Sequence, residues 1–237
     1  MDASWLRALL DALLPSACAG CGERAPSERA LCARCEALVH PIAADACPRC
    51  QLHRASAGPC SEPGPLEAAI AAVWLEPPVS DWIHAFKYPP RGLRGLAPGP
   101  IAAVAELAAR SARRAPGPAP DLVVPVPLHP HRLRTRGFNP ALAVARAVAR
   151  SAGAPVAPTA LERVRDTPSQ TGLDAAARRR NVRGALRARR PVPPRVGIVD
   201  AVITTGATLR EAARALRGAG AESVIAVCAA RTPPPSS

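Results

Sequence analysis

Residues 195–220 read RVGIVDAVITTGATLREAARALRGAG. The run from Val196 to Ile203 is rich in β-branched residues and follows a Pro-Pro pair, a pattern typical of a strand buried on both faces of a parallel sheet. From Leu209 the apolar residues recur at helical spacing, and Gly218 ends the helix. The stretch therefore predicts a buried strand, a short turn and a helix, which is the repeating unit of an α/β fold.

Small residues join the predicted strand to the predicted helix. They are Thr204, Thr205, Gly206, Ala207 and Thr208. The first backbone amides of a helix can bind an anion, and the helix dipole adds positive potential at the same place. Ligands of open α/β sheets also bind beyond the carboxyl ends of the strands. We therefore expect the turn to bind a phosphate group. The alternative is an ordinary βα unit with a threonine cap. A P-loop is not indicated, because no Gly-Lys-Ser/Thr follows the strand.

This stretch resembles the phosphoribosyl-diphosphate (PRPP) signature of type I phosphoribosyltransferases, in which an apolar strand and two acids precede Thr-Thr-Gly-x-Thr. Asp200 and the five turn residues match, whereas Ala201 stands where the family usually has its second acid. The resemblance implies a type I phosphoribosyltransferase-like parallel sheet flanked by helices. It also implies that the turn holds the 5-phosphate, that Asp200 takes a ribose hydroxyl, and that Mg²⁺ binds with PRPP. The loss of one acid at Ala201 should weaken sugar binding or catalysis.

Composition sets the size and the charge of the protein. The 237 residues suffice for one sizeable α/β domain and a small appendage. The formal net charge is +13, nearly all of it from arginine, with Lys87 as the single lysine. This positive field favours phosphates, nucleotides or a nucleic-acid backbone as partners. A basic surface that only keeps the protein in solution is the alternative.

Residues 1–14, MDASWLRALLDALL, are apolar but too short to span a bilayer. Asp2 and Asp11 also argue against a signal peptide. We expect a short amphipathic helix that packs on the body of a cytoplasmic protein with no membrane partner.

Seven of the eight cysteines fall between residues 18 and 60. Three CxxC pairs in a chain without an export signal favour metal binding over disulfides, which remain the alternative. A complete structural Zn²⁺ site needs four ligands, and the first two pairs supply them: Cys18, Cys21, Cys32 and Cys35. Only three cysteines remain for a second site, which we expect to be incomplete: Cys47, Cys50 and Cys60. An interleaved arrangement, in which the first and third pairs share one metal, stays open.

These signals divide the chain into two parts. We expect an N-terminal helix and cysteine-knuckle zinc module over residues 1–62, and the phosphoribosyltransferase-like domain over residues 63–237. The further strands are predicted at residues 68–75, 121–127 and 222–229. The further helices are predicted at residues 81–88, 101–114 and 140–151.

The loop over residues 129–139 is a second candidate phosphate site. It carries three arginines and two histidines, and arginine binds diphosphate oxygens in a bidentate manner. Arg132 and Arg136 are expected to stabilise a departing diphosphate, and Gly137 permits close backbone approach. Lys87 lies near the end of the short helical stretch at residues 81–88 and is expected to reach a phosphate. The histidines face solvent or lie near the phosphate.

Several motifs resemble the ComF family of competence proteins. Val-Pro-Val-Pro-Leu at residues 124–128 precedes the Arg-Gly-Phe-Asn motif, whose Arg136 and Asn139 match, while Pro140 replaces the usual glutamine. The mobile hood of the family matches at Thr167, Gln170, Leu173, Arg180 and Asn181. The resemblance covers nearly the whole chain. It implies a role in DNA uptake and natural transformation beside a helicase partner, and it adds Asn139 to the candidate substrate-binding residues.

The hood, about residues 163–190, is crowded with arginine and poor in large apolar residues. Such a segment makes a poor strand or core helix. A long polar segment between two buried strands is usually a functional lid or binding loop. A disordered basic linker is the alternative.

Two functions follow from the residues. The first is a PRPP-dependent transferase, with Asp200 and Arg136 as its catalytic residues. The second is a non-catalytic module that binds PRPP or a nucleotide and holds single-stranded DNA electrostatically. DNA binding would then be salt-sensitive, because the aromatic residues of a stacking groove are missing. Ala201 favours the second function, and the intact turn and hood favour the first, so catalysis stays open.

Overall fold

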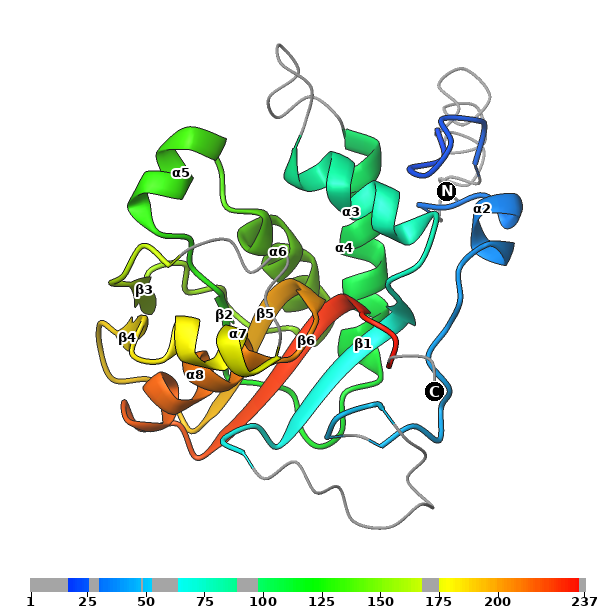
Figure 1. Cartoon of the computed structure of the whole chain (residues 1–237). Coiled ribbons are helices and arrows are strands. Elements are labelled where there is room, and N and C mark those ends of the chain that lie inside the picture. Colours follow the sequence, from blue (N-terminus) through cyan, green and yellow to red (C-terminus); the bar gives the residue numbers. More distant parts are fainter. Residues whose placement is uncertain are drawn as a thin grey trace, which may run out of the picture.

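The computed structural model describes residues 17–25, 30–47, 49–52, 64–88, 98–167 and 175–234. The expectations for residues 1–14 and for Cys60, Gln170 and Leu173 lie outside this range. The helices are α2 (Ala33–Ala37), α3 (Val79–Lys87), α4 (Pro98–Arg113), α5 (Pro130–Arg136), α6 (Pro140–Ala152), α7 (Ala175–Val182) and α8 (Ala207–Arg217) (Figure 1). The strands are β1 (Ala68–Trp74), β2 (Leu122–Pro125), β3 (Leu161–Arg163), β4 (Leu186–Ala188), β5 (Arg195–Ile203) and β6 (Ser223–Arg231).

A four-stranded sheet of order β1-β6-β5-β2 forms the centre of the protein, and every neighbouring pair in it is parallel. Within β5, residues 196–199 are buried without interruption, as expected for a strand covered on both faces. The register sets Asp200 opposite Cys228 of β6. The predicted parallel sheet flanked by helices is confirmed.

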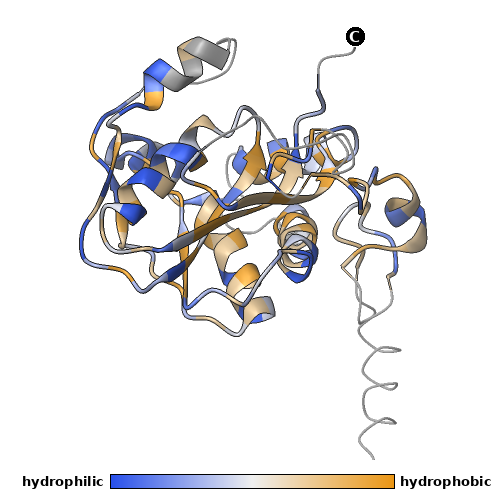
Figure 2. Cartoon of the chain, turned by 90° about the horizontal axis from the view of Figure 1, so that it is seen from below, coloured by the Kyte–Doolittle hydropathy of each residue, from blue (hydrophilic) through white to orange (hydrophobic). Residues whose placement is uncertain are grey.

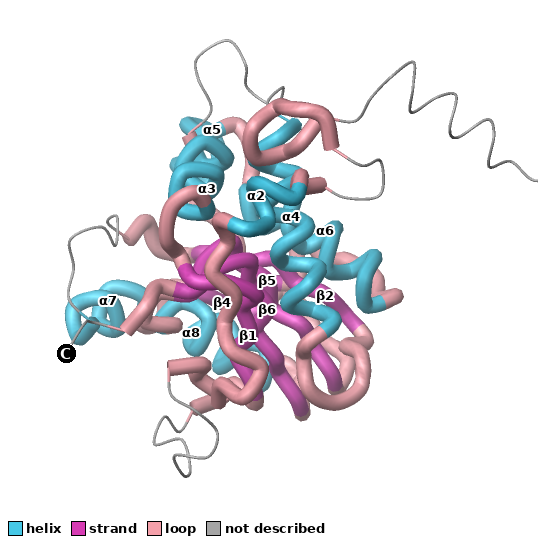
Figure 3. The backbone as a smooth tube through the Cα atoms, turned by 90° about the vertical axis from the view of Figure 1, so that its right-hand side faces the viewer, coloured by secondary structure: helices cyan, strands magenta, loops and turns pink. Residues whose placement is uncertain are grey.

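Two helical layers cover the sheet. The helices α3, α4 and α6 lie on one side and α8 lies on the other (Figure 3), and each side has its own apolar cluster. Hydropathy follows the same plan, with hydrophobic residues concentrated at the sheet and hydrophilic residues toward the outside (Figure 2). In the described part of the chain, no helix is long and apolar enough to cross a membrane.

Between β2 and α6, the structure differs from the sequence prediction. Residues 129–139 were expected to form a loop, but residues 130–136 form the helix α5. Its boundaries carry ordinary helix signals, since Pro130 occupies the first turn and His129 caps it. Gly137 ends it with a left-handed φ of 85°. The arginines therefore project from a helix.

The hood also contains more secondary structure than its composition indicated. β3 and β4 pair antiparallel, and α7 lies between them in sequence. The arginine-rich strand is stabilised across the pair, because Glu162 accepts hydrogen bonds from Arg187 Nε at 2.7 Å and from Arg189 Nε at 2.8 Å. The expectation that this segment makes a poor strand is therefore wrong for residues 186–188.

The cysteine module, residues 17–25, 30–47 and 49–52, covers the free edge of β1. The Trp74 amide donates to the His40 carbonyl at 2.9 Å, and the Ile42 amide donates to the Ala72 carbonyl at 3.0 Å. The buried Gln51 side chain then mimics a strand, because its Nε2 donates to the Ala71 carbonyl at 3.0 Å and its Oε1 accepts from the Ala71 amide at 2.7 Å. A covered edge cannot pair with another chain.

Replacing Gln51 by methionine tests this edge contact. Methionine has the same length but makes neither hydrogen bond, so both polar groups of Ala71 lose their partner at a buried position. We expect the free energy of unfolding to fall by about 2–4 kcal/mol, since each unsatisfied buried group costs about 1–3 kcal/mol. Urea denaturation measures this change. Leu52→Gln, at an exposed neighbour, should stay within about 0.5 kcal/mol of the original protein. Equal losses in the two variants would contradict the account.

Helix α4 ties the cysteine module to the domain. Both terminal nitrogens of the Arg110 guanidinium group donate hydrogen bonds to the Glu36 carboxylate, and Nη2 lies 2.9 Å from Oε2. Arg114 Nη2 donates to the Ile42 carbonyl at 2.9 Å. Cys18, Leu31 and Cys35 also belong to the same apolar cluster as residues of α3 and α4. The described cysteine module and the domain therefore share one apolar cluster.

Candidate anion site and metal centre

A cavity of about 380 Å³ opens at the carboxyl ends of β1 and β5. It lies between α3 and the turn that joins β5 to α8, and we call it the α3–α8 cavity. Its lining comprises Leu75, Ser80, Ile83, His84, Lys87, Tyr88, Asp200, Val202, Ile203, Thr204, Gly206, Ala207, Thr208 and Leu209. The cavity thus brings Lys87, Asp200 and most of the predicted phosphate turn together, although 113 residues separate the lysine from the aspartate in the sequence.

The phosphate turn, residues 204–208, presents the N-terminus of α8 to the cavity. Gly206 is the N-cap and has a left-handed φ of 70°. Gly206 has no side chain that could cap this helix. The amides at a helix N-terminus and the positive end of the helix dipole favour an anion. Thr205 does not line the cavity, and its Oγ1 accepts a weak hydrogen bond from the Ala207 amide at 3.4 Å.

Arg210 folds back over the phosphate turn. Its Nη2 donates to the Thr205 carbonyl, and a Cβ atom on Gly206 would lie 3.2 Å from its Nη1. A glycine is therefore required at residue 206 both by the backbone angle and by the close guanidinium. The arginine adds a positive charge one turn from the helix start.

Asp200 carries the negative charge of the cavity. Burial raises the pKa of its carboxyl group, and the positive charges of Lys87, Arg163 and Arg136 act in the opposite direction. Its Oδ1 accepts from the Ala201 amide at 2.7 Å. Ala201 itself has an exposed fraction of 0% and packs in the apolar cluster of α3 and α4. A second acid at this position would be a buried charge.

Lys87 of α3 and Arg136 at the end of α5 place positive charge beside the cavity. Arg136 lies over the Tyr88 ring, with its guanidinium carbon 4.9 Å from the ring centroid. Phe86 and Phe138 pack with centroids 6.0 Å apart, which holds the segment after α5 against α3. The arginine predicted to contact diphosphate is thus next to a cavity residue.

Three other predicted residues lie away from the cavity lining. Asn139 caps α6, accepting from the Ala141 amide at 3.1 Å and donating to the Val126 carbonyl at 3.0 Å. Gly137 ends α5. Arg132 Nη2 donates to the Thr167 carbonyl at 2.5 Å, so it binds the hood.

No pattern in the sequence predicted the contact between the hood and α5. Asp166 Oδ2 lies 3.2 Å from His131 Nδ1 and 3.5 Å from His129 Nδ1. The nearly buried Arg163 donates to Thr167 Oγ1 at 2.6 Å. Burial lowers the pKa of Arg163, while Asp200 and Asp166 favour its charge. These residues are far apart in sequence and belong to no spacing motif.

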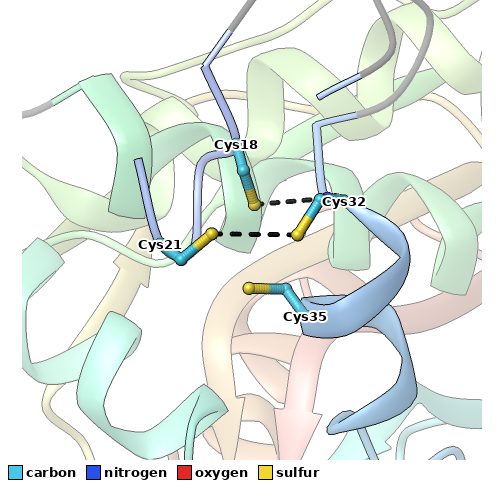
Figure 4. A group of neighbouring side chains, drawn as sticks. All are labelled: Cys18, Cys21, Cys32 and Cys35. Atoms are coloured by element: carbon cyan, nitrogen blue, oxygen red, sulfur yellow. Dashed lines mark hydrogen bonds between the residues drawn. The ribbon is translucent and has the colours of Figure 1, made fainter. Parts of the chain in front are cut away.

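The cysteine group, Cys18, Cys21, Cys32 and Cys35, is the candidate metal centre. All four sulfur atoms lie within 4.8 Å of one another and point toward a common centre (Figure 4). The Sγ atoms of Cys21 and Cys32 are 3.7 Å apart. Tetrahedral Zn²⁺ with bonds of about 2.3 Å places its sulfur ligands about 3.8 Å apart, so the group fits this ion.

Backbone amides support thiolate character at Cys18. Burial raises the pKa of this thiol, but amide donors reverse the effect and lower it to about 6. Two of them are the amides of Cys32, at 3.2 Å, and Gly20, at 3.4 Å. The grouping supports the pairing of the first two CxxC knuckles over the interleaved alternative. Cys47 and Cys50 are buried outside this group.

Comparison with known proteins adds to this geometry. Residues 9–62 match the double zinc ribbon domain family. The DNA utilization protein YhgH of Escherichia coli O157:H7 is 32% identical over 217 residues, covering 91% of this chain and 90% of that protein. The YhgH protein of Salmonella typhi is 34% identical over 193 residues, covering 78% and 84%. Competence protein F of Haemophilus influenzae is 37% identical over 109 residues, covering 44% and 48%.

One solved structure is also similar in part. It is the glutamine PRPP amidotransferase of B. subtilis complexed with ADP and GMP, at 27% identity and a TM-score of 0.36. The match covers 54% of this chain and 26% of that chain. A likeness at this TM-score is too loose to carry an argument about the site.

Proposed function

Because the chain belongs to the ComF family, together with DNA utilization protein YhgH and competence protein F, we propose that it binds PRPP with Mg²⁺ in the α3–α8 cavity and serves DNA uptake and natural transformation. The observation that carries this proposal is the cavity itself, which places the N-terminus of α8, a lysine and a carboxylate around one space. An anionic phosphate and a sugar hydroxyl are the groups that such a site suits.

The expected orientation of the ligand follows from the charges. The 5-phosphate binds at the phosphate turn, and Asp200 accepts a hydrogen bond from a ribose hydroxyl. Lys87 and Arg136 face the diphosphate, where negative charge grows as the anomeric bond breaks. Mg²⁺ would enter with PRPP beside Asp200 and would supply positive charge that neutralises part of the diphosphate. Arg132 joins the diphosphate only when the hood releases it from Thr167.

Calorimetric titration of the zinc-loaded protein with PRPP and Mg²⁺ tests this proposal. Thr208→Trp is the control variant, because Thr208 lines the cavity at the phosphate turn and a bulky side chain there would fill the space for the phosphate. We expect saturable binding by the original protein and none by the variant. A folded original protein that does not bind PRPP would refute the proposal, and equal binding by both proteins would refute the assigned site.

The raised pKa of Asp200 gives a second prediction. A carboxyl group whose pKa is raised by burial destabilises the folded protein when it is ionised, so Asp200→Asn should raise the thermal midpoint at neutral pH. The same variant should bind PRPP about 10- to 100-fold more weakly, since a charged hydrogen bond contributes about 1.5–3 kcal/mol.

The pH dependence of PRPP affinity distinguishes the protonation of Asp200 from the protonation of the ligand. As the pH falls toward the raised pKa of Asp200, the original protein should lose affinity because this carboxyl group takes up its proton. The phosphate of PRPP also takes up a proton at pH ~6, but this protonation changes the affinity of the Asp200→Asn variant in the same way. The ratio of the two affinities should therefore shrink on acidification. A constant ratio would contradict the assignment of the ribose hydroxyl to Asp200.

A non-catalytic role in DNA binding is the second candidate. The observation that favours it is Ala201, a buried alanine that stands beside Asp200 where a second acid is expected. Strand β4 and the segment after it expose Arg187 and Arg189, which are paired with Glu162, and Arg190. Exposed arginines suit a phosphate backbone. Fluorescence anisotropy with labelled single-stranded DNA would show affinity falling steeply with salt. Affinity that does not depend on salt would exclude this electrostatic mode. A competence helicase is the expected protein partner, in the cytoplasm.

A further inference from the structure

Helix α3 has two faces with different neighbours. Ser80, His84 and Lys87 follow one another at helical spacing and line the α3–α8 cavity. Val79, Trp82 and Phe86 lie on the other side of the helix and are buried. Any displacement of the buried face therefore moves the residues that line the cavity.

The buried face of α3 approaches the cysteine group closely at Gly20. Gly20 lies between Cys18 and Cys21, and its amide donates to Cys18 Sγ at 3.4 Å. A Cβ atom on Gly20 would lie 2.5 Å from Trp82 Cζ2 and 3.0 Å from Cys35 Sγ. Gly20 thus fills the space between the indole ring and the metal ligands, with no room for a methyl group.

The cavity is not in direct contact with the metal centre. None of the cysteines in the described part of the chain lines the α3–α8 cavity. Helix α4 also touches the module, since a Cβ atom on Gly99 would lie 2.9 Å from the Ala19 carbonyl oxygen. However, α4 contributes no residue to the cavity lining among those described. The route from the cysteine group to the cavity therefore passes through Gly20, Trp82 and α3.

We propose that zinc binding at the cysteine group and ligand binding in the α3–α8 cavity are positively coupled, and that Trp82 is the positioning residue that connects them. The metal fixes the knuckle against the indole ring, and the ring fixes the helix that carries His84 and Lys87. Coupling between two sites is reciprocal. Bound PRPP should therefore slow the loss of zinc, and loss of zinc should weaken PRPP. This inference rests on the proposed function.

Two matched glycine substitutions test the coupling. Gly20→Ala forces Trp82 away from the knuckle. Gly22→Ala makes the same change in the same knuckle, where φ is 77° and no described atom lies within 4 Å. The second variant strains the backbone without touching α3. We expect both to retain zinc, measured by metal analysis. Gly20→Ala should bind PRPP at least about fivefold more weakly than Gly22→Ala, the lower end of typical coupling.

Hydrogen exchange gives a reading that needs no ligand. Amides of residues 79–87 should exchange faster in Gly20→Ala than in Gly22→Ala, while those of residues 207–217 in α8 should not differ. Trp82→Phe, which withdraws the ring atoms facing Gly20, should reproduce the effect if Gly20→Ala fails to fold. In the original protein, PRPP should slow zinc transfer to a chromogenic chelator.

The outcomes separate the two hypotheses. If the original protein binds no PRPP, the proposed function fails, and the exchange of α3 alone decides whether the metal centre positions this helix. Unchanged α3 exchange in both Gly20→Ala and Trp82→Phe overturns the inference. Equal PRPP affinities of the two glycine variants, or zinc transfer that PRPP does not slow, also overturn it while leaving the proposed function intact.

Discussion

Thr204→Glu is expected to weaken PRPP binding at least tenfold relative to Thr204→Gln. Thr204 is exposed and lines the α3–α8 cavity at the end of β5, so both variants should fold. Glutamate places a negative charge beside the expected 5-phosphate, whereas glutamine has the same size without the charge. Two like charges about 4 Å apart repel by roughly 4 kcal/mol at the effective dielectric constant of a protein surface.

Calorimetry at low and high salt measures this difference. The gap between the two variants should narrow as the salt concentration rises, because ions screen exposed charges. If glutamate and glutamine weaken binding equally, the effect is steric and the phosphate is not at the turn. If neither variant changes the affinity, PRPP binds elsewhere.

Cys35→Ser is expected to destabilise the whole described chain in a single transition. Serine keeps the size of the side chain but is a poor ligand for zinc, and Cys35 is buried in the cluster that also contains Trp82 and Leu107. Loss of a structural metal commonly costs more than about 4 kcal/mol. At this chain length we expect the thermal midpoint to fall by roughly 10 °C.

Circular dichroism, with zinc release recorded in parallel, measures this transition. Ala33→Ser is the control, because it adds a hydroxyl group at an exposed position of the same short helix α2. The Arg110–Glu36 contact and the shared cluster predict that zinc release and unfolding coincide. A partial transition at low temperature, followed by unfolding at the original midpoint, would show that the module folds independently.

The central strand and its turn were predictable because local signals agree with each other. Residues 195–220 combine a β-branched run, small turn residues and a helical period, and the structure has β5 and α8 at these positions. The CxxC spacing predicted a four-cysteine site but left an interleaved pairing open, and the grouping of the sulfur atoms in the structure favours the first two pairs. The expectation for Lys87 rested only on its place near the end of the predicted helix at residues 81–88.

The errors arose where boundary signals or distant contacts decide the structure. Pro130 and Gly137 are ordinary start and stop signals of a helix, but the arginines between them also fit a phosphate-binding loop. The hood strand depends on Glu162, which pairs with arginines about 25 residues later. The burial of Ala201 depends on which face of β5 meets the α4 layer. No local pattern in the sequence carries this information.

A structure of the zinc-loaded protein with PRPP and Mg²⁺ bound tests the central claim most directly. The account predicts the 5-phosphate within hydrogen-bonding distance of the amides of residues 204–208, with a ribose hydroxyl at Asp200. A second cavity of about 410 Å³ lies at the other end of the sheet, beside Pro120 and Gly197. PRPP found there, or anywhere away from the phosphate turn, would contradict the account.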